Sequence, residues 1–127
     1  MSTTKLAGTQ LANFTPVATV PQLQETDITP GTGAVVKASD TITVDYTGAV
    51  AATGIIFQSS LDSGQTATFG LNQVIPGWTQ GIPGMKVGGT RRLLIPANLA
   101  YGANPPAGSG IPATAALVFD VTVHKID

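Results

Sequence analysis

The chain contains few side chains of the types that catalyse reactions or bind metals. It has one histidine, His124, and no cysteine, so the sequence excludes thiol catalysis, disulfide bonds and cysteine-based metal sites. A single histidine without cysteine does not make a typical zinc site, and we expect neither a bound metal nor a cofactor. The acidic residues are scattered, and no pair of them stands out for acid–base work. His124 follows Asp120 and Thr122 in alternation, so we expect it on the solvated face of a strand.

Aromatic side chains gather beside turns instead. The long loop that contains Tyr101 is rich in Gly and Pro, and loops of this kind in compact domains are either functional or disordered. The aromatic residues form either the hydrophobic core or, in part, an apolar pocket with a few polar groups at its rim. The residues concerned are Tyr46, Phe57, Phe69, Trp78, Tyr101 and Phe119.

The only tryptophan, Trp78, lies in the stretch VIPGWTQGIPGM at residues 74–85. Pro76 suits the start of a helix and Pro83 ends it, so a helix here has about two turns at most. Trp78 and Ile82 are spaced i, i+4 and share one face. So short a helix is not stable alone, and we expect Trp78 to pack it against a sheet.

The rest of the chain is predicted to form strands. Residues 41–50, 90–95 and 116–126 alternate between apolar and polar side chains, which is the pattern of half-buried strands. Shorter strands are expected around residues 24–28 and 66–69. Strands with one polar face favour an antiparallel sheet with water on one side. The sequence therefore predicts an α+β fold with about five strands and one short helix.

Length and composition limit the remaining possibilities. A chain of 127 residues favours a single domain, and we interpret residues 1–23 as a flexible leader or linker before a domain at 24–127. Acidic and basic residues nearly balance without a basic run, so we expect no nucleic-acid partner. No apolar run is long enough to span a membrane. The charged fraction of 10% favours an extracytoplasmic protein (secreted, periplasmic or anchored through a missing N-terminal segment) over a cytoplasmic one.

Six segments carry a resemblance to a known family. The chain resembles the FKBP-type peptidyl-prolyl cis-trans isomerases, bacterial members in particular, over roughly residues 24 to 127. The segments are VDYTG (44–48), FQSS (57–60), QVIPGWTQGI (73–82), MKVGGTRRLLIP (85–96), LAYG (99–102) and GIPATAALVFDV (110–121).

The resemblance implies a curved antiparallel sheet wrapped around the short helix, with a pocket between them. Trp78 would form its floor, and Tyr101 would offer a hydroxyl at its rim. The backbone N–H of Ile75 would bind a ligand carbonyl, and the loop at 97–113 would cover the site. The implied catalytic residues are Tyr46, Phe57, Gln58, Ile75, Trp78, Tyr101 and Phe119, and the implied substrate-binding residues are Phe69, Val74 and Ile111.

One position departs from the family. Gln58 stands where the family usually has an aspartate, so the chain has no carboxylate at this edge of the pocket. Either the domain is a prolyl isomerase that helps unfolded or extended segments to fold, or it is a catalytically weak proline-peptide-binding or chaperone module of the same fold. We expect proline-containing polypeptides as substrates, macrolides of the rapamycin type as possible inhibitors, and a monomer.

Overall fold

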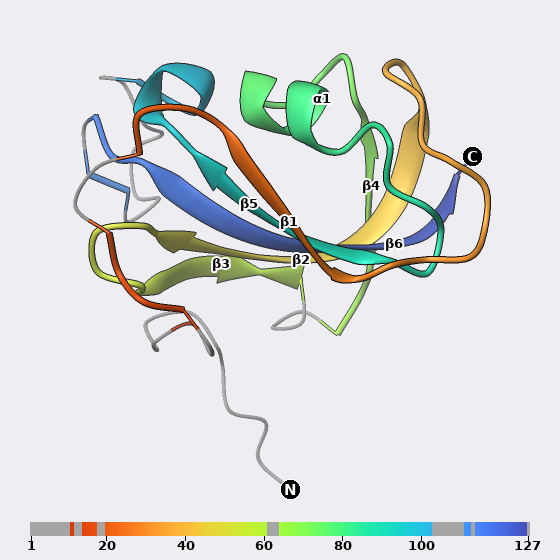
Figure 1. The fold of residues 1–127 in the computed structure, drawn as a ribbon, viewed down its shortest axis with the longest axis horizontal. Helices are drawn as coiled ribbons and strands as arrows, with labels where there is room; N and C mark the ends of the chain where they lie inside the picture. The colour runs from red at the N-terminus through yellow and green to blue at the C-terminus, as the bar shows by residue number, and fades with distance from the viewer. Residues whose placement is uncertain are drawn as a thin grey trace, which may run out of the picture.

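The computed structural model describes residues 11, 14–17, 20–60, 64–102, 111–112 and 114–126. Six strands form one antiparallel sheet in the order β1-β5-β6-β2-β3, and β4 pairs with β2 outside this path (Figure 1). A helix, α1, and a short 3-10 turn, η2, complete the described elements. Their bounds are β1 Gln24–Thr29, β2 Thr41–Val50, β3 Ile56–Ser59, β4 Ala67–Gly70, α1 Pro76–Gly81, β5 Thr90–Ile95, η2 Ala97–Leu99 and β6 Leu117–Ile126.

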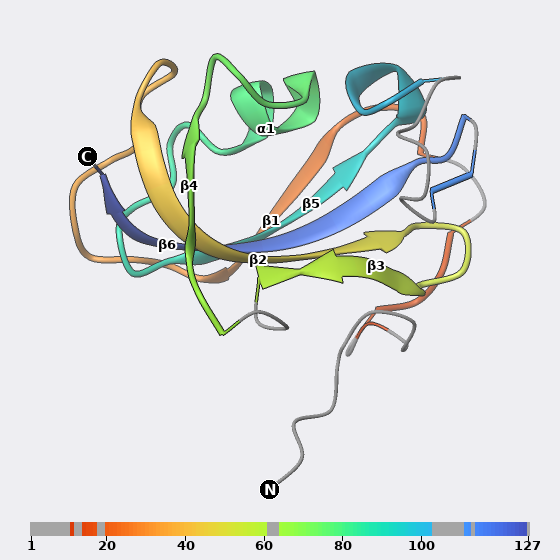
Figure 2. The same cartoon turned by 180° about the vertical axis from the view of Figure 1, so that it is seen from behind.

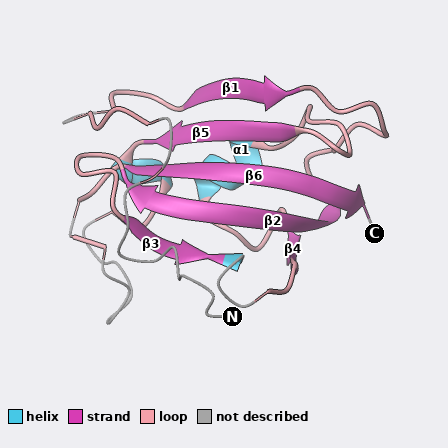
Figure 3. Ribbon diagram, turned by 90° about the horizontal axis from the view of Figure 1, so that it is seen from below, coloured by secondary structure: helices cyan, strands magenta, loops and turns pink. Residues whose placement is uncertain are grey.

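The two long strands give the sheet its shape. β2 and β6 have ten residues each and pair from Ile42↔Ile126 to Val50↔Leu117, with an irregularity between Thr43 and Val44. Long paired strands twist and such irregularities bend them further, so the sheet curves around α1 (Figures 1 and 2). Seen from below, strands β1, β5, β6, β2 and β3 lie side by side in this order across the molecule (Figure 3). This confirms the predicted α+β fold.

The main hydrophobic core lies between α1 and the concave face of the sheet. Trp78 is 4% exposed and Ile82 is fully buried, as their shared helix face predicts. Gly77 lets the helix approach β5 closely, because a Cβ at this position would collide with the side chain of Ile95. Among the described residues, no helix is long and apolar enough to cross a membrane.

The opposite, outer face of the sheet is less solvated than the alternation predicts. A second apolar cluster forms there from Leu11, Ala49, Ile56 and Val118, with Phe14 and Leu94 packed against it. Thr43 and Thr47, predicted to face water, are also buried. The hydroxyls of these threonines are satisfied by Thr68 at 2.9 Å and Ser59 at 2.8 Å, respectively.

Part of the predicted leader contributes to this outer cluster. The backbone N–H of Leu11 donates to the carbonyl of Gly54 at 2.8 Å, and that of Val17 donates to Ala51 at 2.9 Å. The ring of Phe14 lies 5.6 Å from the guanidinium carbon of Arg92. Described segments before residue 24 therefore pack on the sheet, while the division of the chain at residue 24 stays a prediction.

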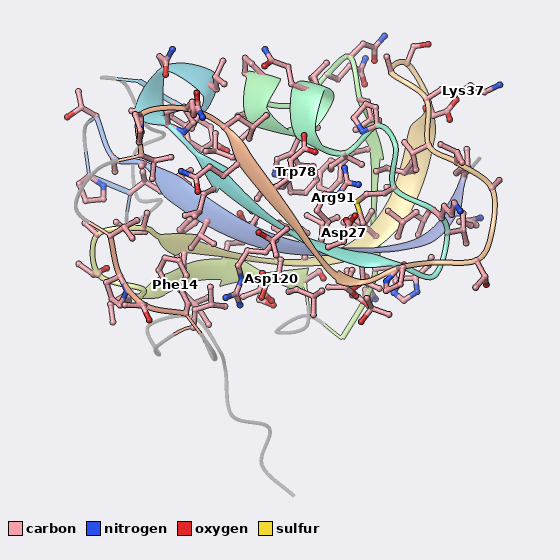
Figure 4. The ribbon with its side chains drawn as sticks, viewed as in Figure 1. Phe14, Asp27, Lys37, Trp78, Arg91 and Asp120 are labelled. Atoms are coloured by element: carbon pink, nitrogen blue, oxygen red, sulfur yellow. The ribbon has the colours of Figure 1, made fainter. Side chains whose placement is uncertain are left out.

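The adjacent arginines of β5 point to opposite faces. Arg92 lies on the outer side and pairs with Asp120 through Nε–Oδ1 at 2.7 Å and Nη2–Oδ2 at 2.8 Å. Arg91 is 8% exposed; its Nη1 donates to the carbonyl of Gly81 at 2.8 Å and its Nε to Asp27 at 2.6 Å (Figure 4). Helix α1 has no basic side chain in its own last turn, so Arg91 supplies positive charge to its C-terminal end from the neighbouring strand.

Candidate functional site

A hollow of about 470 Å³ opens between α1 and the concave side of the sheet. Its volume lies within the range typical of ligand pockets. Side chains reach it from β2, β3, β4, β6, the start of α1 and the segment after η2, so the curvature of the sheet is what brings them together. The residues lining it are Tyr46, Phe57, Gln58, Phe69, Gln73, Val74, Ile75, Trp78, Tyr101 and Phe119.

Trp78 is held in place by three aromatic rings that meet it nearly at right angles. The ring centroids of Phe69 and Phe119 are each 5.3 Å from that of Trp78, and the centroid of Tyr46 is 5.5 Å away. Edge-to-face contacts of this kind are favourable, so the indole position is fixed before any ligand binds. Figure 4 shows Trp78 between α1 and the sheet.

The indole contributes mainly an apolar surface, and its one hydrogen-bond donor, Nε1–H, is buried. Its Nε1 is buried and has no hydrogen-bond partner among the residues that the structure describes. The residue is 4% exposed, so the floor that it was expected to form offers a ligand only a small area.

The residues on either side of Trp78 fix the position of helix α1 beside the hollow. Ile75 precedes the helix in an extended conformation and Pro76 begins it, as suits a residue without a backbone N–H. The hydroxyl of Thr79 donates to the carbonyl of Leu71 at 2.6 Å. This bond joins the helix to the segment that follows β4, and Arg91 binds the carbonyl of Gly81 at the C-terminal end of the helix.

Gly48 on β2 makes room for two of the lining rings. Phe57 and Phe119 meet at right angles, with centroids 5.8 Å apart. A Cβ at Gly48 would lie 2.6 Å from Cε1 of Phe119 and 2.8 Å from Cζ of Phe57. Any larger residue would push these rings out of position, so the shape of the hollow depends on glycine here.

Among the described residues that line the hollow, the polar side chains are two phenols and two amides, those of Tyr46, Tyr101, Gln58 and Gln73. Burial raises the pKa of Tyr46 above its usual value of 10.0, and the neighbouring phenol of Tyr101 acts in the same direction. The hydroxyl of Tyr46 is thus protonated at neutral pH and can donate a hydrogen bond. Gln58 is exposed and can accept or donate one.

The structure brings together all the residues named from the resemblance except Ile111. Ile111 is 9% exposed and belongs to the hydrophobic core, and it is not among the residues that line the hollow. Gln73 lines the hollow although we did not name it as a site residue. The middle of the loop expected to cover the site, 103–110, and residue 113 lie outside the described residues.

His124 lies away from the hollow. Its Nε2 is 2.7 Å from Oδ2 of Asp45, and the hydroxyl of Ser60 donates to Oδ1 of the same carboxylate at 2.8 Å. These contacts lower the pKa of Asp45, with the hydrogen bond to His124 as the largest cause. The prediction of an exposed His124 is correct, and its partner is a carboxylate that sequence alternation did not suggest.

Comparison with known proteins identifies the family. Residues 33–124 match the model of the FKBP-type peptidyl-prolyl cis-trans isomerases. The chain is 53% identical over 97 residues to the FKBP-type isomerase FkpA of Aeromonas hydrophila, and the match covers 76% of this chain and 35% of that protein. It is 49% identical over 98 residues to a probable FK506-binding protein of Corynebacterium glutamicum, with 76% and 80% covered.

Solved structures agree with this assignment. The crystal structure of FkpA from Escherichia coli has a TM-score of 0.75 at 40% identity, covering 83% of this chain and 48% of that one. A peptidyl-prolyl cis-trans isomerase from Pseudomonas syringae has a TM-score of 0.74 at 34% identity, with 83% and 75% covered. The chain belongs to the FKBP-type peptidyl-prolyl cis-trans isomerase family. It spans about a third of the Aeromonas protein but most of the Corynebacterium one.

Proposed function

We propose that the hollow binds the proline of an X–Pro segment and accelerates rotation about the preceding peptide bond. Unfolded or extended polypeptides are the substrates, so the domain helps other proteins to fold. The observation that carries the proposal is an open hollow of about 470 Å³ over a buried indole with three rings packed against it. A preformed apolar site of this kind suits a small aliphatic ring.

The reaction needs no nucleophile or general base. Rotation is slow because resonance gives the C–N bond partial double-bond character, and uncatalysed exchange takes tens of seconds with an activation energy of about 20 kcal/mol. No covalent bond is made or broken. The scarcity of histidine and the absence of cysteine in the sequence are therefore no obstacle to this activity.

Desolvation favours the twisted state over the planar one. The planar amide is charge-separated and water stabilises its oxygen, whereas the twisted amide has lost resonance and is less polar. A dry site penalises the planar state more, which amounts to tighter binding of the transition state. A thousandfold acceleration needs about 4 kcal/mol, because each 1.36 kcal/mol gives about a tenfold rate increase.

Individual lining residues have distinct roles in this proposal. Trp78 contacts the proline ring, while Phe57 and Phe119 close the sides of the site. The hydroxyl of Tyr101 and the backbone N–H of Ile75 donate hydrogen bonds to substrate carbonyls. Tyr46 keeps its proton because burial raises its pKa, and it supplies a further donor within the hollow.

Burying the proline ring contributes about 1–3 kcal/mol. The loss of translational and rotational freedom consumes most of this gain, so short peptides bind weakly. Larger apolar rings of the macrolide type would fill more of the same hollow and would compete with the peptide. Several relatives are named FK506-binding proteins, which supports this competition. The domain acts as a monomer in this proposal.

A second function is a binding module of the same fold. Gln58 favours it, because this exposed residue carries no charge at the edge of the site. In that case the hollow would hold proline-containing segments without speeding their rotation. NMR exchange spectroscopy on a Leu–Pro peptide separates the two: faster cis–trans exchange on addition of the protein supports the enzyme, and saturable binding without acceleration supports the module.

A further inference from the structure

Among the residues that the structure describes, none that lines the hollow has a side chain that is charged at neutral pH. These lining residues are apolar, amide or phenolic, and burial raises the pKa of Tyr46 further from neutrality. The segments that supply the lining are themselves uncharged in the sequence: residues 46–61, 63–85 and 93–119 contain no Asp, Glu, Lys, Arg or His.

Two acidic residues that border the lining in sequence, Asp45 and Asp120, lie on the other side of the sheet. Asp45 precedes Tyr46 on β2 and Asp120 follows Phe119 on β6, and neighbouring residues of a strand point to opposite faces. Asp45 contacts His124 at 2.7 Å. Asp120 forms a two-point ion pair with Arg92, and Figure 4 shows Asp120 on the outer side of the sheet, away from Trp78.

Arg91 and Lys37 are two further charged residues that the structure places away from the hollow. Arg91 binds Asp27 at 2.6 Å and the carbonyl of Gly81 at 2.8 Å, at the end of the helix opposite to Ile75. Figure 4 shows Lys37 at the edge of the molecule, pointing away from Trp78. Across the described residues, the field inside the hollow therefore comes from amide, hydroxyl and peptide dipoles.

We propose that this site does not select its substrates by the charge of the residue before proline. Its substrate class then includes Glu–Pro, Asp–Pro and Lys–Pro segments alongside uncharged X–Pro segments. This inference rests on the proposed function and specifies which polypeptides that function serves. Gln58 and Gln73 are the residues that determine it, because their amides occupy the polar rim without imposing a sign.

The physical basis is the range of Coulomb interactions at a partly solvated site. A carboxylate at the rim would act on a charged X side chain over a few ångströms, where salt at physiological concentration screens incompletely. An amide dipole acts weakly on a nearby charge, and its orientation adapts to either sign. With an uncharged rim, the rate therefore depends on the contacts of the proline ring and on the shape of X, and little on the charge of X.

Paired peptides isolate the effect of charge from that of shape. The peptides Gln–Pro and Glu–Pro have nearly the same size at X and differ by one charge, and a Lys–Pro peptide supplies the opposite sign. NMR exchange gives kcat/KM for each at low and physiological salt. The variant Gln58→Glu places a carboxylate at the rim, and Gln24→Glu on the edge strand β1 is the matched control with the same change in net charge.

We expect the three kcat/KM values of the unmodified protein to agree within about twofold and to change little with salt. Gln58→Glu should favour Lys–Pro over Glu–Pro by about fivefold or more at low salt, and added salt should reduce that preference. Gln24→Glu should behave like the unmodified protein.

Two results overturn the inference in different ways. Acceleration of Gln–Pro together with a fivefold or larger preference between Glu–Pro and Lys–Pro in the unmodified protein would show that a charged group acts on the site. Asp62, outside the described residues, would be the first to replace by Asn. No acceleration of any peptide, Gln–Pro included, would overturn the proposed function itself and this inference with it.

Discussion

Replacing Trp78 by leucine should impair both the stability and the activity of the domain, by amounts that can be separated. The indole is 4% exposed and meets three rings at 5.3 to 5.5 Å between centroids. Truncating a buried tryptophan to alanine costs about 3–5 kcal/mol. Leucine refills part of the volume, so we expect the free energy of unfolding to fall by about 2–4 kcal/mol.

The effect on activity has a different origin. Without the indole, a bound proline ring loses its main apolar contact, and burying that ring contributes about 1–3 kcal/mol. Each 1 kcal/mol corresponds to about fivefold in rate, so kcat/KM for a Leu–Pro peptide should fall at least several-fold. The measurement is NMR exchange at a temperature where urea unfolding curves show the variant to be folded, with rates corrected for the folded fraction.

Ile82→Ala is the matched control for this experiment. Ile82 is fully buried at the C-cap of the same helix, four residues after Trp78, but it does not line the hollow. Its truncation costs about 2–5 kcal/mol, which is similar to the cost at Trp78. We expect Ile82→Ala to keep most of its kcat/KM per folded molecule. Equal losses of activity in the two variants, or an unchanged rate in Trp78→Leu, would refute the role of the indole as floor.

Three further predictions follow from contacts around the site. Gly48→Ala should lower kcat/KM several-fold, because its Cβ would displace the rings of Phe57 and Phe119. Peptide titrations followed by NMR should show weaker binding, and unchanged binding would contradict the proposed displacement of the rings. Arg91→Met should lower the free energy of unfolding by about 1–3 kcal/mol, chiefly by leaving a buried carbonyl without its donor, since the partner carboxylates are exposed and contribute little; a change below the error of urea unfolding would contradict this. The pKa of Asp45 is lowered in the folded state, so its stabilising contribution is present above the unfolded value of 3.8 and is lost as pH falls through the folded value. Asp45→Asn should therefore reduce the loss of stability at acid pH, and an identical loss in both proteins would contradict this.

Alternation predicted most of the sheet because its strands are long and half-buried. The segments at 41–50 and 90–95 match β2 and β5, and the start of β6 differs by one residue. The sequence did not predict β3, a strand of four residues, although a strand was expected near β4, which has the same length. The sheet accordingly has six strands where about five were expected.

The burial of Arg91 could have been predicted from its position on β5, but we did not predict it. Arg91 has the same parity on β5 as Leu93 and Ile95, which places it on the concave side. An arginine on a buried face needs partners, and the structure provides them from α1 and β1. Parity alone could have predicted its burial, but the identity of the partners depends on how β1 and α1 meet β5.

The sequence indicated which aromatic residues were candidates for the site, but not how they are arranged in space. Their types allow either a closed core or an open pocket, and the difference depends on where the sheet curves and how closely α1 approaches it. Gly77 allows the close approach of α1, and Gly48 leaves room for the rings of Phe57 and Phe119. The apolar residues before position 24 gave no periodic signal, yet Leu11 is 6% exposed because the outer face of the sheet offers it an apolar surface.

The central claim is that one hollow both holds proline and eases its rotation, and a double titration tests it most directly. Trp78 is the only tryptophan, so indole fluorescence reports on the floor of that hollow alone. A Leu–Pro peptide would be titrated while fluorescence and NMR exchange are measured on the same samples. The account predicts a fluorescence change and an acceleration that saturate with the same dissociation constant. Acceleration without any change in the indole signal, or saturation of that signal with the exchange rate unaltered, would contradict it.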